Sequence, residues 1–386
     1  MGADIRSTTR TDVLYPRELE EAAAPVKLAF FRNSIVAHPL FDAKLAELRS
    51  MIDSGLRGTM LVLVGPAGVG KSALGEVLCQ MINREYFDAF PDDSHRIPAA
   101  WVEAWAAERD RFDWLDFYES ILGALQIPLI GESVPEVKRM VAGREVVVPV
   151  FDRHPRPSLR ILRQRLRRAM VMRSPALIFV DEASNILLSS QHEHVKRHAN
   201  TLRSIVNRVD TRLLLTGAYE LYELVTQSGQ LARRGEVIHF RPYQRDEAEQ
   251  FMHGLIALQN CIPFNEGCSL GRFAEMLFDQ SLGCIGHLKR ILVKAMSIAM
   301  AEGKRIDHPV LLHSCYPPST LERLRQEVYS GYRRVEGAPH PEDRGHTEPA
   351  PAASEAAIDD SPEASKTVTH RNRIGRTRPS RGWFCN

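Results

Sequence analysis

Short, continuously apolar runs alternate with amphipathic stretches through the first two-thirds of the chain. Residues 61–64, 176–180 and 213–215 hold only aliphatic or aromatic side chains, a pattern typical of strands buried on both faces. Residues 113–125 have apolar side chains at helical spacing, which predicts a helix with one face on a sheet. Such alternation predicts an α/β fold with a parallel sheet. The pattern also predicts strands at 97–104, 144–148 and 236–240, and helices before residue 55, from residue 72 and at 158–172.

The pattern changes in the second half of the chain. From Asp246 to about Gly303 it is continuously helical, and Asp246 with Glu249 predicts a capping box at the start. Beyond residue 336, apolar periodicity is lost and Pro, Ala, Ser and charged residues dominate, which predicts a disordered tail. We therefore divide the chain into an N-terminal arm (1–27), an α/β core (28–243), a helical lid with a C-terminal helix (244–336) and a tail (337–386).

Composition narrows the class of protein only slightly. The 386 residues carry a net charge of +2, so the whole molecule gives no electrostatic argument about nucleic acid. Six cysteines without C-x-x-C spacing suit a reducing compartment better than a disulfide framework, and buried thiols better than a zinc site. No apolar run reaches membrane-spanning length and no signal-peptide core is evident. We expect a soluble, cytoplasmic protein without a membrane partner.

A glycine-rich loop follows the first buried run. Its sequence matches G-x-x-x-x-G-K-[ST], the Walker A phosphate loop, between a predicted strand and a predicted helix. Backbone N–H groups of such a loop surround phosphate oxygens, and the helix N-terminus favours negative charge. Lys71 is expected at the β- and γ-phosphates and Ser72 at Mg²⁺. The predicted ATP-binding residues are Gly65, Pro66, Ala67, Gly68, Val69, Gly70, Lys71, Ser72 and Ala73.

Polar residues follow two later buried runs. Asp181 and Glu182 end the run at 176–180, where Asp181 would bind Mg²⁺ and Glu182 would orient or deprotonate the attacking water. Alone, this pair could equally cap the next helix, but a Walker A loop upstream favours the catalytic interpretation. Thr216 is our candidate sensor of the γ-phosphate, with an ordinary Ser/Thr turn as the alternative. Arg233 and Arg234 could supply an arginine finger to a neighbouring subunit.

Several cationic stretches could contact nucleic acid. The 158–172 helix has five arginines that would face outward, either toward solvent or toward phosphates or a neighbouring subunit. A helix containing His192, His194 and His198 has an i, i+4 pair, but an exposed polar face is favoured over a metal site. Other residues that could track DNA phosphates are Arg109, Arg111, Lys138, Arg139 and Arg144.

Taken in this order, the motifs resemble the AAA+ ATPases, whose fold is a P-loop NTPase parallel sheet with helices on both faces and a small all-α lid. Three stretches further resemble the TnsC/TniB regulators of DNA transposition: His38-Pro39, residues 230–240 and residues 283–289. The resemblance covers roughly residues 28–300. It implies an ATP- and Mg²⁺-dependent homo-oligomer, a ring or helical filament, that binds double-stranded DNA and links a target-selector protein to a transposase. Lys289 falls where many of the wider superfamily have a sensor-two arginine that reaches nucleotide.

Two other functions remain open at this point. A replication initiator or helicase loader would share the ATPase core, but such proteins usually add a DNA-binding domain, and no helix-turn-helix pattern follows residue 303. A signalling ATPase would switch scaffolding assemblies without binding DNA. In each case we expect hydrolysis of ATP to ADP and phosphate.

Overall fold

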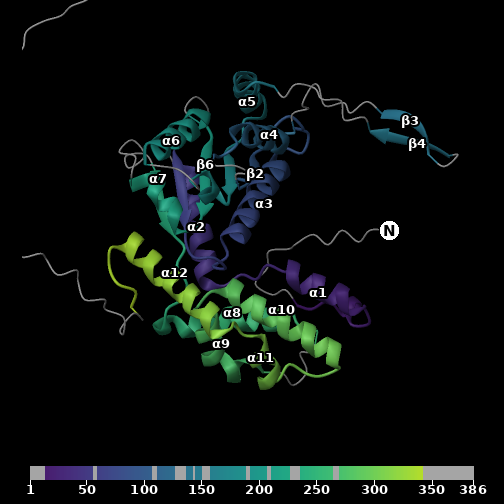
Figure 1. Cartoon of the computed structure of the whole chain (residues 1–386), viewed down its shortest axis with the longest axis vertical. Coiled ribbons are helices and arrows are strands. Elements are labelled where there is room, and N and C mark those ends of the chain that lie inside the picture. The colour runs from purple at the N-terminus through teal and green to yellow at the C-terminus, as the bar shows by residue number, and fades with distance from the viewer. Residues whose placement is uncertain are drawn as a thin grey trace, which may run out of the picture. The chain divides into compact units, whose positions relative to one another are not determined.

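The computed structural model describes residues 14–54, 59–106, 111–126, 136–141, 144–149, 157–187, 192–206, 210–226, 235–263 and 269–341. Its central sheet has five parallel strands in the order β2-β5-β6-β1-β7 (Figure 1). The first strand of the chain therefore lies between the last two, and the strand that precedes Asp181 lies beside the one that holds Thr216. The strand bounds are β1 Met60–Val64, β2 Ala99–Glu103, β5 Leu177–Asp181, β6 Arg212–Gly217 and β7 Gly235–His239.

Helices cover both faces of this sheet. Side chains of β1, β5 and β6 alternate between two apolar clusters, as the period of a strand requires. One cluster includes α4, α5, α6 and α7, and the other includes α2 and α3. Both layers were expected from the continuously apolar runs. The helix bounds are α2 Pro39–Ser54, α3 Lys71–Ala89, α4 Trp114–Ala124, α5 Leu159–Arg173, α6 His192–Val206 and α7 Tyr222–Thr226.

Gly75 on α3 sets the distance between the P-loop helix and β5. A Cβ at this position would lie 1.9 Å from Cζ of Phe179, whose ring is fully buried. The ring can therefore lie against α3 only because residue 75 has no side chain. This contact brings the start of α3 close to the strand that ends in Asp181.

The helical lid has its own apolar cluster, which also includes Phe31 of the N-terminal segment. Tyr15 N–H donates to the carbonyl of Asn260 over 2.9 Å, so the described part of the arm contacts the lid. The last helix, α12, lies beyond this cluster and returns to the core. The remaining bounds are α1 Ala24–Asn33, α8 Ala248–Asn260, α9 Ala274–Ser281, α10 Ile285–Glu302, α11 His308–Ser314 and α12 Pro318–Glu336.

The structure corrects two details of the sequence-based expectations. The capping box before α8 is formed by Gln244 and Glu247, not by Asp246 and Glu249, because a 3-10 turn at residues 245–247 moves the first cap two residues earlier. The predicted strand at 144–148 has a partner that the pattern did not indicate. The strands β3 (Glu136–Val141) and β4 (Arg144–Pro149) form a separate antiparallel hairpin.

Candidate functional site

The glycine-rich loop connects β1 to α3 and is shaped by backbone conformations that only glycine adopts without strain. Gly68 and Gly70 have φ angles of +74° and +113°. Gly65 lies so close to the end of β7 that a Cβ there would be 2.2 Å from the carbonyl oxygen of Phe240. The loop is thus held against the sheet at its start and turns its tip toward the N-terminus of α3, the geometry expected of a phosphate loop.

The ammonium group of Lys71 lies inside the loop. It donates to the carbonyl oxygens of Gly65 and Pro66, each over 2.8 Å. Burial lowers the pKa of Lys71, and the nearby negative charges, led by Glu182, oppose that shift. A cation in such a desolvated loop would gain strongly from a polyanionic ligand.

Asp181 and Thr216 meet across adjacent strands. The Thr216 hydroxyl donates to Asp181 Oδ1 over 2.7 Å, and the backbone N–H of Glu182 donates to the same oxygen over 3.0 Å. Both side chains are buried, with Thr216 fully so. Two hydrogen bonds to one oxygen fix the orientation of the carboxylate, as expected for a metal ligand with a supporting outer shell.

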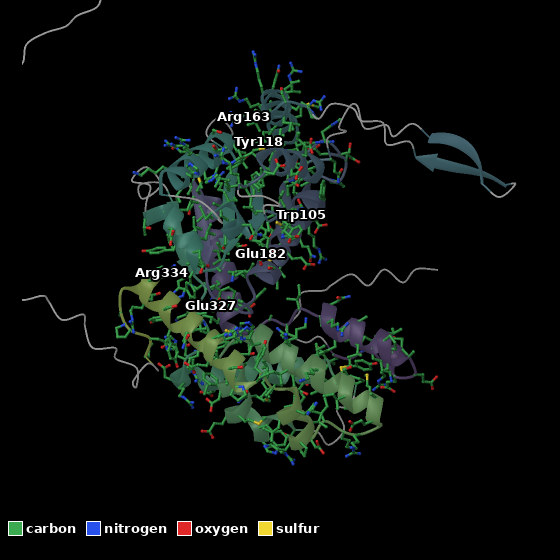
Figure 2. The ribbon with its side chains drawn as sticks, viewed as in Figure 1. Trp105, Tyr118, Arg163, Glu182, Glu327 and Arg334 are labelled. Carbon is green, nitrogen blue, oxygen red and sulfur yellow. The ribbon has the colours of Figure 1, made fainter. Side chains whose placement is uncertain are left out.

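Glu182 extends from the same strand end into exposed space (Figure 2). Its backbone is left-handed, with φ +49°, a conformation that is uncommon outside glycine and costs about 1 kcal/mol or more. The following turn keeps this arrangement, because Asn185 donates to the carbonyl of Ala104 over 2.8 Å. The carboxylate is therefore near Lys71 yet open to water, which suits a residue that orients or deprotonates an attacking water.

The first turn of α10 rests directly on the glycine-rich loop. Gly286 N–H donates to the carbonyl of Gly68 over 2.8 Å, and the imidazole of His287 lies where a Cβ on Gly68 would be, 2.2 Å from Cδ2. Cys284 is fully buried near Lys71, and burial raises the pKa of its thiol to about 12. The lid thus covers the tip of the loop through small residues and one histidine.

Comparison with known proteins agrees with this geometry. Residues 56–225 match the family model described as "AAA domain". The chain contains an AAA domain. No curated protein matches the sequence.

Three solved structures are similar to the chain at low identity. They are the Aeropyrum pernix ORC2 protein in ADPNP–ADP complexes (14% identity, TM-score 0.47, 78% of this chain and 80% of that one), domain III of the Thermotoga maritima replication initiation protein DnaA (12%, 0.43, 74% and 94%) and the Aeropyrum pernix ORC1 protein in complex with DNA (17%, 0.44, 85% and 70%).

Lys289, the expected sensor-two residue of the AAA domain, contacts the N-terminal segment instead of the glycine-rich loop. Its ammonium donates to the carbonyl oxygens of Arg32 and Ser34 over 2.6 and 2.7 Å, and burial lowers its pKa. The lid residue that the structure places on the loop is His287. A contact between Lys289 and nucleotide stays a prediction that would require these two hydrogen bonds to break.

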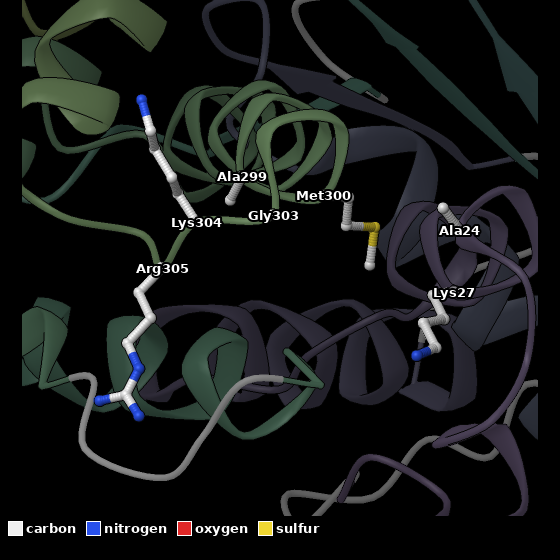
Figure 3. Close-up of a pocket in the computed structure, with 7 residues that line it drawn as sticks. All are labelled: Ala24, Lys27, Ala299, Met300, Gly303, Lys304 and Arg305. Carbon is white, nitrogen blue, oxygen red and sulfur yellow. The ribbon is translucent and has the colours of Figure 1, made fainter.

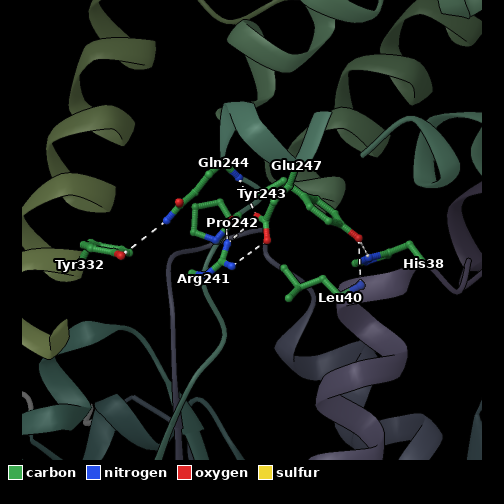
Figure 4. A network of polar contacts seen from close by, with 8 residues as sticks. All are labelled: His38, Leu40, Arg241, Pro242, Tyr243, Gln244, Glu247 and Tyr332. Carbon is green, nitrogen blue, oxygen red and sulfur yellow. Dashed lines mark hydrogen bonds and ion pairs between the residues drawn. The ribbon is translucent and has the colours of Figure 1, made fainter. Parts of the chain in front are cut away.

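A polar network joins the AAA core to the lid at residues 241–247 (Figure 4). Tyr243 donates to His38 Nδ1 over 2.7 Å and accepts from the N–H of Leu40 over 3.0 Å. Arg241 forms two hydrogen bonds with the carboxylate of Glu247, at 2.6 and 2.7 Å. Burial lowers the pKa of His38 to about 4, so it is a neutral acceptor here. The His38-Pro39 motif therefore anchors α2 to the connection between core and lid.

Other predicted residues of the AAA domain are only partly placed. Arg109, Arg233 and Arg234 lie outside the described residues, and their roles stay predictions. Arg111 is exposed, and Lys138, Arg139 and Arg144 lie on the β3–β4 hairpin. Among described side chains, no group of three His, Cys, Asp or Glu could hold a metal. No helix in the described part of the chain is long and apolar enough to cross a bilayer.

Three contributors to the site were missed in the sequence. Gly75 and Gly286 permit close packing, and a glycine within a helical pattern gives a weak signal of this kind. Glu327 of α12 accepts from the N–H of Ala67 over 3.3 Å, although 260 residues separate them. No local pattern could have indicated that contact, because it depends on how α12 packs.

A cationic pocket lies away from this site, between α1 and the end of α10 (Figure 3). Lys27, Lys304 and Arg305 line it, but Lys27 donates to the carbonyl of Glu20 and Lys304 pairs with Glu302. None of its lining residues belongs to the glycine-rich loop or to the strand ends that carry Asp181 and Thr216. We therefore assign the nucleotide to the AAA core and not to this pocket.

Proposed function

We propose that this protein is an ATPase that assembles on double-stranded DNA and regulates transposition, connecting a target-selector protein to a transposase. The observation that carries the ATPase part is the meeting of Lys71, Asp181 and Thr216 at the carboxyl ends of three adjacent strands. Polar groups from several strand ends converge there, as in nucleotide sites of open α/β sheets.

The residues divide the chemistry among them. Backbone N–H groups of residues 65–73 and the ammonium of Lys71 would hold the phosphates, while Ser72 and Asp181 would hold Mg²⁺. The metal ion would neutralise charge on the phosphate oxygens. Glu182 would take a proton from the attacking water, and Thr216 would keep the Asp181 carboxylate in place.

The cationic face of α5 supports the DNA part of the proposal. Arg160, Arg163, Arg167 and Arg168 are exposed, and none of them forms an ion pair with a described carboxylate. Arg163 lies over the ring of Tyr118 at 5.9 Å (Figure 2), so one end of this face is held in place. A row of unpaired guanidinium groups suits contacts with phosphates, which position a protein on DNA without reading its sequence.

Trp105 supports a contact with a macromolecule near the strand ends. Its side chain is 71% exposed just after β2, next to the described end of a segment that contains Arg109 and Arg111. A large exposed aromatic side chain costs solubility unless a partner covers it. A neighbouring subunit or DNA would provide that cover.

The assignment to transposition is supported by the TnsC/TniB resemblance of residues 230–240 and 283–289. In the structure, the second stretch is the part of the lid that rests on the loop through Gly286. A replication initiator or helicase loader is the main alternative, and a signalling ATPase that does not bind DNA is the second.

Sedimentation with a slowly hydrolysed ATP analogue tests the proposal. We expect large assemblies only when analogue, Mg²⁺ and duplex DNA are all present, and equal competition by duplexes of unrelated sequence. Assembly without DNA would favour the signalling ATPase, and preference for one sequence would favour an initiator. No assembly under any condition, from a folded protein, would contradict the proposal.

Paired variants test the DNA face itself. Arg163→Gln/Arg167→Gln should weaken DNA binding and reduce the salt dependence of its affinity by about two phosphate contacts, with a slope change of about 0.9 each. Arg272→Gln/Arg305→Gln removes the same charge from exposed positions of the lid and is the matched control. Equal affinities for both double variants would remove α5 from the DNA-binding surface.

A further inference from the structure

The helix α12 places a carboxylate on the phosphate-binding loop. Glu327 Oε1 accepts a hydrogen bond from Ala67 N–H over 3.3 Å, and its charge also acts on the ammonium of Lys71. Figure 2 shows Glu327 on this helix. In a P-loop, backbone N–H groups and the lysine are the groups that bind phosphate oxygens. The carboxylate oxygen of Glu327 therefore occupies a donor that a phosphate would use.

Close packing against the core holds α12 in this position. A Cβ on Gly331 would lie 1.9 Å from Cδ2 of Tyr219, so the helix backbone lies directly on this ring. Tyr219 is almost fully buried and belongs to the turn after β6, the strand that carries Thr216. Val328, one residue after Glu327, is also buried. The register of the helix is thus fixed within one turn of Glu327.

A polar chain holds the end of the same helix. His239, the last residue of β7, contacts Glu336 Oε1 through Nδ1 at 2.6 Å and the Tyr219 hydroxyl through Nε2 at 3.1 Å. Tyr332 lies against the His239 ring, and Arg334 pairs weakly with Glu223 at 3.9 Å. Contacts with β7, with the turn after β6 and with the loop after β1 therefore place α12 across three adjacent strands of the core.

Charge makes this contact incompatible with bound phosphates. A nucleoside triphosphate brings several negative charges to the groups that Glu327 now faces, and like charges repel strongly where burial limits screening. Gly331 and its contact with Tyr219 leave α12 little freedom to move Glu327 alone. The nucleotide must therefore displace the carboxylate, together with at least part of the helix.

We propose that α12 is an autoinhibitory helix, in which Glu327 competes with nucleotide phosphates for the P-loop. This inference rests on the proposed nucleotide site and adds a mode of regulation to it. Any partner that pulls α12 away from Tyr219 and His239 would increase affinity for ATP. The same release would leave the lid contact of Gly286 with Gly68 as the remaining cover of the loop.

The test is the affinity of the full chain for a fluorescent ATP analogue. Glu327→Gln keeps the volume and an acceptor for Ala67 N–H but removes the charge, and should bind the analogue about tenfold more tightly. The gain should shrink as salt is raised, because it is electrostatic. Glu322→Gln is the matched control, since it removes the same charge from the same helix at a residue that pairs with Arg325 instead.

A second variant acts on the docking of the helix. Gly331→Leu places a side chain where the Tyr219 ring lies and should increase affinity by a similar factor, without the same salt dependence. Circular dichroism and thermal unfolding show whether this variant keeps its fold. Lys71→Ala should abolish binding and identifies the site that the analogue occupies.

The outcomes separate the two proposals. If Glu327→Gln binds the analogue no more tightly than the unaltered chain, while Lys71→Ala abolishes binding, the autoinhibitory role is wrong and the nucleotide site stands. A gain in Glu322→Gln equal to that in Glu327→Gln would also overturn it, by showing a general charge effect. If no folded variant binds the analogue, the nucleotide site fails, and the inference fails with it.

Discussion

The Thr216 hydroxyl donates to Asp181 Oδ1 over 2.7 Å, from the strand that lies beside β5 in the sheet. Because Thr216 is fully buried, its hydroxyl has this carboxylate as its short-range partner and does not extend to the open side of the site. Thr216 is therefore a positioning residue for the predicted Mg²⁺ ligand. The sequence-based role, a direct contact with the γ-phosphate, would require the hydroxyl to leave Asp181.

Replacing Thr216 should weaken the use of Mg²⁺ more than the binding of nucleotide. Thr216→Val keeps the shape but removes the donor, and we expect about a tenfold to hundredfold loss in metal affinity or turnover. Thr216→Ser restores the donor and should recover most of that loss. The measurement is ATP turnover against Mg²⁺ concentration. An unchanged Mg²⁺ dependence in Thr216→Val would contradict the positioning role.

Glu182→Gln should separate binding from hydrolysis. The amide cannot accept a proton from water, so turnover should fall by about 10²- to 10⁴-fold while the affinity for ATP changes little. Lys71→Ala should instead abolish binding, because the phosphates lose their main cation. Equilibrium binding and phosphate release, measured on the same preparations, check both variants. Hydrolysis by Glu182→Gln at the rate of the unaltered chain would show that another group activates the water.

The sequence predicted the parts of the site that lie on one strand end or one loop. Lys71 and Asp181 follow continuously apolar runs, and burial on both faces of a sheet leaves a clear pattern. The contacts of Glu327 and His287 could not be predicted in this way, because they join segments more than 200 residues apart. Lys289 differs for another reason. Its partners are backbone carbonyl groups, which any sequence provides.

Arg233 and Arg234 are predicted to act across a subunit interface, since they precede the last core strand. Removing the working finger should reduce turnover by about 10³-fold or more and leave nucleotide binding by single subunits intact. Mixing Arg233→Ala/Arg234→Ala with Lys71→Ala tests this idea, because each variant supplies what the other lacks. Mixed assemblies should recover part of the hydrolysis. Co-assembled mixtures that stay inactive would show that the arginines act within their own subunit.

His38 should make stability depend on pH in a defined range. In the folded chain its Nδ1 faces two donors, the Tyr243 hydroxyl and the N–H of Phe41, and burial lowers its pKa to about 4. The unfolded chain has the ordinary pKa of 6.5 and takes up the proton first. The contribution of His38 to stability is therefore complete above pH 6.5, and about 3 kcal/mol is lost as the pH falls from 6.5 to 4.

Replacing the imidazole should remove this dependence. His38→Gln keeps a side-chain acceptor at the start of α2 but does not titrate, so its free energy of unfolding should fall less between pH 7 and pH 5 than that of the unaltered chain. Denaturant unfolding at both pH values gives the comparison. His313→Gln, at an exposed histidine of α11, controls for the loss of a histidine as such. If His38→Gln loses as much stability on acidification as the unaltered chain, protonation elsewhere weakens the fold, and the link between His38 and Tyr243 is not acid-sensitive.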